Sequence, residues 1–128
     1  LTVGELAEQI KRKGHFSGGK LTGNPETEVS TVFLAEHITG RDEKDKALIR
    51  KIDEEQIDVI IPLELVDYTV AEYIRDASCA GFGKALLSFG HFNTEELGMS
   101  YLEQYFSFLF NGKVDVIFCP SADMFQYL

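Results

Sequence analysis

The chain has 128 residues, of which 45% are hydrophobic and 26% charged, a composition that excludes an intrinsically disordered protein and fits one globular domain. Asp and Glu outnumber Lys and Arg by 21 to 12, and the resulting formal charge of -9 disfavours nonspecific binding to nucleic acids. No apolar stretch reaches the roughly 20 residues that span a bilayer, and no signal peptide is visible, so we expect a cytoplasmic protein without membrane contact.

Apolar periodicity and turn residues predict alternating helices and strands along the chain. Helices are expected over residues 3–13, 42–55, 65–80 and 94–110, and strands over residues 20–22, 29–34, 57–61, 84–89 and 114–119. The run 57–61 is almost continuously apolar, as in a strand covered on both faces, and Pro62 is expected to end it. The alternation predicts a single α/β domain, a three-layer sandwich with a mixed or mostly parallel sheet flanked by helices.

The junction between the fourth predicted strand and the last helix carries the most informative residues. Gly90 allows a sharp turn and leaves His91 at the carboxyl edge of the sheet, where open α/β folds bind ligands. Asn93 is expected to cap the helix, with Glu96 reaching back in a capping box. That arrangement leaves Glu95 free in the first helical turn, so His91 and Glu95 can converge on one point.

An imidazole and a carboxylate in this position have two interpretations. Together they suit divalent Zn, Mn, Fe or Ni better than Ca or Mg. A histidine at a strand end can equally be an ordinary polar residue, and an acidic residue in a first helical turn suits the helix dipole. Two ligands also fall short of the four that zinc takes, so spacing alone leaves both interpretations open.

Residues 90–95, Gly-His-Phe-Asn-Thr-Glu, resemble the Gly-His-aromatic-x-Ser/Thr-Glu signature of the NIF-three-like dinuclear-metal family, often labelled type-two GTP cyclohydrolase I. Residues 1–8 resemble the helix that opens the second half of that family. Residues 23–26, Gly-Asn-Pro-Glu, followed by a Val-Ser-Thr-Val strand, resemble its Gly-Asp-Pro turn. Order and spacing hold to about Val116, so the resemblance covers most of the chain.

The resemblance implies that residues 1–128 form the C-terminal half of a longer protein. Proteins of the family typically assemble as ring-like hexamers with two metal ions in each subunit, which implies a homo-oligomer here. The family's C-terminal metal ligands match His91 and Glu95. Its remaining ligands, a His-His pair and an aspartate, belong to the N-terminal half and have no match in this sequence.

Two stretches depart from the family pattern. After the central strand the family shows Thr-Gly-Glu or Thr-Gly-Asp and then a histidine, whereas here the acid persists as Glu64, the glycine is lost and Tyr68 stands near the histidine position. Glu64 is expected to lie behind the metal ligands or to contact substrate. The family's glycine-rich loop is replaced by Ala-Glu-His ending at His37, which either lines the same rim as Glu64 or is a surface histidine.

The last predicted helix has two apolar faces, one expected in the core and the other against a further domain or subunit. Its second face contains Leu97, Tyr101 and Phe108, and the apolar residues 124–128 are expected to dock as well. Cys79 and Cys119 are too few for a disulfide framework and are expected as buried thiols.

Two classes of function follow. The first is a metal-dependent hydrolase that acts on a nucleotide or related heterocycle, with its catalytic residues unassigned. The second is a non-enzymatic interaction or regulatory module in which any bound metal is structural. No organic cofactor is expected, because Gly18-Gly19 does not open a helix as a phosphate-binding loop would.

Overall fold

The computed structural model describes residues 1–123 and 125–127. The helices in this part of the chain are α1 (Val3–Gly14), α2 (Asp42–Glu54), α3 (Val70–Cys79) and α4 (His91–Leu109). The strands are β1 (Lys20–Thr22), β2 (Val32–Ile38), β3 (Val59–Leu65) and β4 (Ala85–Ser88). None of the helices among these residues combines the length and the apolar character needed to cross a membrane.

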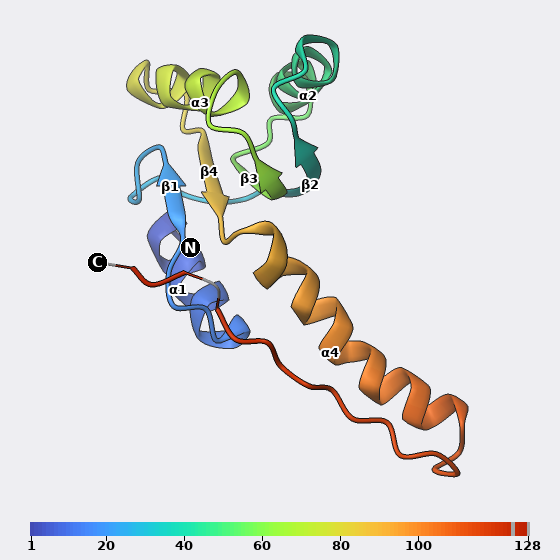
Figure 1. Ribbon diagram of the computed structural model, residues 1–128. Coiled ribbons are helices and arrows are strands. Elements are labelled where there is room, and N and C mark those ends of the chain that lie inside the picture. Colours follow the sequence, from blue (N-terminus) through green and yellow to red (C-terminus); the bar gives the residue numbers. More distant parts are fainter. Residues whose placement is uncertain (124, 128) are drawn as a thin grey trace.

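The strands form one mixed sheet in the order β1-β4-β3-β2. Strands β2, β3 and β4 are parallel, and β1 adds to the edge in the antiparallel direction. Helices α2 and α3 lie on one side of the sheet and α1 on the other (Figure 1). The predicted α/β class, with helices flanking a mixed sheet, is confirmed.

The core lies on both faces of the central strands. Because side chains alternate along a strand, Ile60 and Leu86 face α2 and α3, whereas Val59, Ala85 and Leu87 face α1. All five are at most 2% exposed. This two-sided burial explains why residues 59–63 of β3 and 85–87 of β4 are continuously apolar instead of alternating between polar and apolar.

The prediction that Pro62 ends its strand is wrong, because β3 continues through Pro62 to Leu65. Strand β4 pairs with β3 only at Val59 and Ile60, so Pro62 lies beyond that ladder. A residue without a backbone N–H is tolerated there as it is at a strand edge.

Helix α4 begins earlier than predicted, at His91, and the expected capping box is absent. Asn93 lies inside the helix, where its buried side chain donates a hydrogen bond to the Phe89 carbonyl oxygen (3.0 Å). The carboxylate of Glu96 accepts a hydrogen bond from the backbone N–H of Ser121 (2.6 Å). Asn93 therefore fixes the turn between β4 and α4, and Glu96 holds the C-terminal segment.

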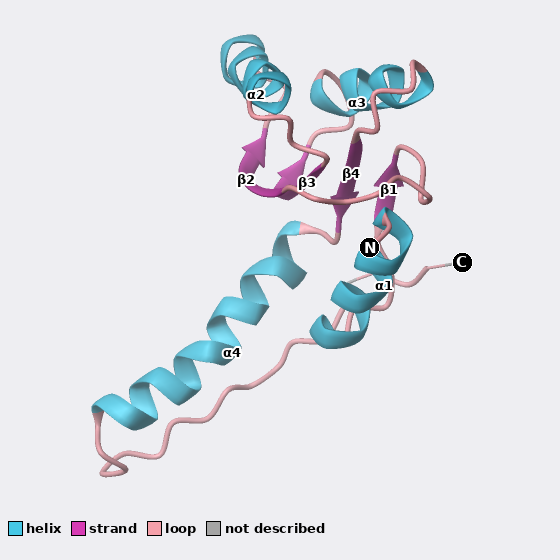
Figure 2. Ribbon diagram, turned by 180° about the vertical axis from the view of Figure 1, so that it is seen from behind, coloured by secondary structure: helices cyan, strands magenta, loops and turns pink. Residues whose placement is uncertain are grey.

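The strand predicted over residues 114–119 does not form. Helix α4 leads away from the sheet, and the chain returns alongside it as an extended segment toward α1 (Figure 2). An apolar run becomes a strand only where a neighbouring strand edge completes its hydrogen bonds, and α4 carries this run away from the sheet. Ile117 is 77% exposed as a result.

Two predictions about burial are also wrong. Both cysteines, Cys79 and Cys119, lie on the surface as free thiols. Neither apolar face of α4 enters the core, since Asn93 is its one buried residue among those described. Of the C-terminal residues expected to dock, 124 and 128 lie outside the described residues, and Tyr127 packs its ring over Gly18.

Candidate metal centre

A glycine turn places His91 at the carboxyl edge of the sheet. Strand β4 ends at Ser88, and the chain reverses at Gly90, whose φ of +91° is a conformation that residues with a Cβ rarely adopt. His91 is then the first residue of α4, and its side chain is 37% exposed. The local sequence thus presents this imidazole at the rim of the domain.

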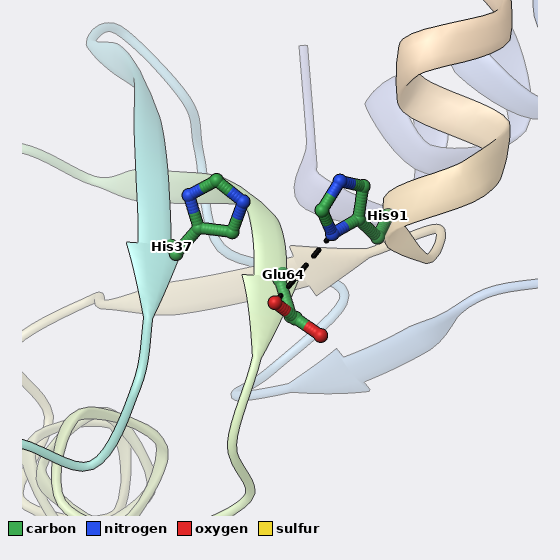
Figure 3. Close-up of side chains that lie close together, drawn as sticks. All are labelled: His37, Glu64 and His91. Atoms are coloured by element: carbon green, nitrogen blue, oxygen red, sulfur yellow. Dashed lines mark ion pairs between the residues drawn. The ribbon is translucent and has the colours of Figure 1, made fainter.

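The two ring nitrogens of His91 face different carboxylates. Its Nε2 lies 3.0 Å from Oε1 of Glu95, one helical turn further along α4. Its Nδ1 lies 3.5 Å from Oε2 of Glu64, which belongs to β3 (Figure 3). The two predicted ligands, His91 and Glu95, are therefore adjacent, and Glu64 lies beside the same imidazole from a different element.

His37 completes the group from the neighbouring strand. In the parallel register of β2 and β3, His37 stands directly opposite Glu64. The rings of His37 and His91 are 4.9 Å apart between centroids. His37, Glu64 and His91 each offer one ligand atom, and these three atoms lie within 4.8 Å of one another. Sequence reasoning marked His37 as a residue of the rim but did not assign it to a metal.

The neighbouring carboxylates act on the charge of His91. The hydrogen bond that His91 donates to the Glu95 carboxylate is the largest cause that raises the pKa of His91 above its ordinary value of 6.5. The negative charge of Glu95 and the contact with Glu64 act in the same direction, and desolvation opposes them. The metal-free protein consequently retains the imidazolium proton to higher pH than a free histidine does.

We expect Glu95→Gln to lower the pKa of His91 in the metal-free protein, because the variant removes the largest stabilising contact of the imidazolium. The stabilising effect of this pair is present below the ordinary pKa and is lost as pH rises through the raised value. An NMR titration of the imidazole Cε1 proton measures the change. Glu103→Gln, two turns further along α4, is the control; an identical His91 titration in both variants would contradict the assignment.

The donors at this edge fit a transition-metal ion. Two imidazoles and two carboxylates form a mixed nitrogen and oxygen set of the kind that Zn, Mn, Fe or Ni prefers, whereas Ca and Mg favour oxygen alone. When both imidazoles are neutral, the carboxylates of Glu64 and Glu95 carry two negative charges that no positive charge of the group compensates. A divalent cation would neutralise them.

Other residues considered from the sequence lie outside this group. Tyr68 donates a hydrogen bond from its hydroxyl to the Gly40 carbonyl oxygen (3.2 Å), so it supports a loop. His15 adopts a left-handed conformation as the C-cap of α1, and its backbone N–H binds the Lys11 carbonyl oxygen. Both residues have structural explanations.

An open cavity of about 780 Å³ adjoins the group. Its lining includes Glu64, His91 and Glu95, together with the ammonium-bearing side chain of Lys20. Aromatic side chains contribute the apolar part of the wall, namely Phe89, Phe92, Phe125 and Tyr127. A ligand bound there would contact the candidate ligands directly.

The whole chain superposes on solved structures of longer proteins. Two crystal structures of the Staphylococcus aureus protein SA1388 match all of it with TM-scores of 0.67 and 0.68 and identities of 19% and 18%, and the match spans 39% and 40% of those chains. A Bacillus cereus protein related to NIF3 matches with a TM-score of 0.68 and 20% identity, and all of this chain corresponds to 32% of that one. No protein-family model and no curated protein matches the sequence.

These similarities define the fold class: an α/β domain of the type found in a protein related to NIF3. The resemblance of the Gly-His-aromatic motif to the NIF-three-like family agrees with this fold. The chain spans well under half the length of the structures that it matches.

Proposed function

We propose that the chain is a metal-binding domain of a cytoplasmic NIF-three-like protein, and that His91 and Glu95 contribute to a dinuclear metal site. The observation that carries this proposal is the position of His91 between two carboxylates, Glu95 at 3.0 Å and Glu64 at 3.5 Å, at the carboxyl edge of the sheet. Open α/β sheets bind their ligands at this edge.

The leading activity of the full-length protein is metal-dependent hydrolysis. A bound divalent ion would supply Lewis acidity, which lowers the pKa of a coordinated water to about 7. The domain contributes the cavity wall, where exposed aromatic rings such as Phe125 and Tyr127 can pack against a flat heterocycle. The class of substrate that we propose is a nucleotide or related heterocycle.

The test uses His91→Ala and Glu95→Gln in the full-length protein. Both variants should lower the metal content, and hydrolytic turnover should fall in parallel, while the fold persists on a core that neither residue enters. Elemental analysis beside a nucleotide-hydrolysis screen measures both quantities. Unchanged metal content in both variants would reject the metal site.

The second candidate is a non-enzymatic interaction module within a homo-oligomer, for which the family suggests a hexamer. Exposed apolar side chains on α4 favour it, among them Tyr101 at 65% and Phe108 at 80% exposure. In that case the same two variants change the size of the oligomer, and the wild-type protein has no turnover to lose.

A further inference from the structure

A second cavity lies at the opposite end of the sheet from His91. It has a volume of about 590 Å³, within the range of small-molecule sites. Its walls come from the C-terminal end of α2, from α3, which lies on the same side of the sheet (Figure 1), and from the loops that lead into β3 and β4. His91 follows the last residues of β4, whereas Lys84, in the wall of this cavity, directly precedes the first. The two sites therefore lie at different ends of the same strand.

Lys84 is a buried cation in the wall of this cavity. Because side chains alternate along a strand, it lies on the same face of the sheet as Leu86, toward α2 and α3. Lys84 is 5% exposed, and its ammonium donates a hydrogen bond to the Ile57 carbonyl oxygen (2.8 Å). No carboxylate of the described residues forms an ion pair with it. Lysine is seldom buried without a partner, because an uncompensated buried charge is costly. The remaining N–H donors of the ammonium therefore suit an anionic ligand.

Two carboxylates line the same cavity, and each is bound by the protein through one oxygen. The Tyr73 hydroxyl donates a hydrogen bond to Oδ1 of Asp53. Burial raises the pKa of Tyr73 to about 12, and the hydrogen bond and charge of Asp53 act in the same direction, so the hydroxyl keeps its proton. Arg75 contacts Oδ1 of Asp76 through Nε (3.0 Å) and Nη2 (2.9 Å). Among the described residues, Oδ2 of either carboxylate has no hydrogen-bond partner, so both can accept from a cationic donor.

An exposed aromatic ring completes the wall. Phe82 is 71% exposed, although its backbone N–H donates a hydrogen bond to the Ala77 carbonyl oxygen (3.0 Å) and so fixes the loop at the end of α3. A ring held in this way offers an apolar face to a flat ligand. The cavity thus combines a buried cation, two carboxylates and an aromatic surface.

We propose that this cavity binds a free aromatic α-amino acid. The carboxylate of such a ligand would accept hydrogen bonds from Lys84, its ammonium would donate to Asp53 and Asp76, and its ring would pack against Phe82. A zwitterion of this kind compensates the buried cation and the carboxylates together, which a ligand of a single charge does not. The proposal is independent of the metal site. The alternative is that Lys84 supports the start of β3 through Ile57 and that the cavity has no ligand.

An NMR titration of the full 128-residue chain with L-phenylalanine, L-tyrosine and L-tryptophan tests the proposal. We expect at least one of them to cause saturable shifts of the backbone amides of Tyr73, Phe82 and Lys84. Two matched probes each omit one charge: 2-phenylethylamine lacks the carboxylate, and 3-phenylpropionate lacks the ammonium. Each should bind about 10- to 100-fold more weakly than L-phenylalanine or its best-bound analogue, because each loses hydrogen bonds between charged groups.

Variants locate the contacts. Lys84→Met keeps the apolar stem of the side chain and removes its charge, and should weaken binding by the same factor of about 10 to 100. Lys113→Met and Asp115→Asn are controls that change an exposed lysine and an exposed aspartate beyond α4, and both should bind as the wild type does. His91→Ala should also bind normally, because it lies at the other end of β4. Circular dichroism establishes that each variant is folded.

Equal affinity for 2-phenylethylamine and the amino acids overturns the proposal, as does wild-type affinity in Lys84→Met. Absence of saturable shifts with all three amino acids also overturns it, and so do shifts confined to the cavity beside His91. The comparison of ligands uses the wild-type chain alone, so it decides the question even where Lys84→Met does not fold.

Discussion

Replacing Ile60 with Ala is expected to lower the free energy of unfolding by about 2–5 kcal/mol. Ile60 lies in β3, the strand between β2 and β4, and is 0% exposed. Its side chain packs in the cluster that joins α2 and α3 to the sheet. Truncation leaves a cavity between the sheet and the helices α2 and α3, and close-packed neighbours relax only in part.

Leu34→Ala is the matched control, because it removes a branched aliphatic side chain from the next strand, where Leu34 is 73% exposed. A surface substitution of this kind changes stability by about 0.5 kcal/mol or less. Urea unfolding followed by circular dichroism measures both variants, with equal slopes required for a valid comparison. Equal losses in the two variants would contradict the position of Ile60 in the core.

The parts of the fold that the sequence predicted are those governed by local pattern. The apolar runs that became β3 and β4 have a composition that suits burial on both faces, and Ile60 and Leu86 are buried as that pattern requires. Helix α2 has amphipathic periodicity and ends within one residue of its expected limit. These signals act over a few residues, so a single sequence contains them.

The errors arise where an element depends on a distant neighbour. Residues 114–119 have the apolar character of a strand, but they are not part of the sheet that the described residues form. The sequence predicts that Pro62 ends its strand. In the structure Pro62 lies beyond the residues of β3 that pair with β4, so the strand can continue through it. Strand pairing is a tertiary property, and local propensity does not specify it.

The same distinction applies to the candidate site. His91 and Glu95 could be paired from sequence, because the turn at Gly90 leaves the histidine at the rim beside the first turn of the helix. In the structure both residues belong to α4, one helical turn apart. The sequence predicts that Glu64 lies behind the metal ligands or contacts substrate, and that His37 either lines the same rim or is a surface histidine. These two residues lie together because the register of β2 and β3 places His37 opposite Glu64. A local sequence motif does not specify that register.

The exposed aromatic side chains of α4 lead to the second large expected effect, on assembly. Helix α4 extends away from the sheet, and among the described residues the returning C-terminal segment lies beside it (Figure 2). Tyr101 and Phe108 are 65% and 80% exposed in the single chain. Large apolar side chains gathered on one projecting element are a common feature of protein interfaces, where Tyr and Phe are enriched. We therefore expect the wild-type chain to associate in solution.

The double substitution Tyr101→Ser and Phe108→Ser is expected to convert that assembly to a monomer of 14.4 kDa. It removes the two aromatic anchors of the helix, and a few such residues supply most of the binding energy of an interface. Light scattering coupled to size exclusion measures the mass. Phe82→Ser is the control, since Phe82 is 71% exposed but follows α3 at the other end of the domain, and this variant should keep the wild-type mass. If the wild-type chain is itself a monodisperse monomer, α4 has no partner in solution. The wild type and the double variant would then have the same mass.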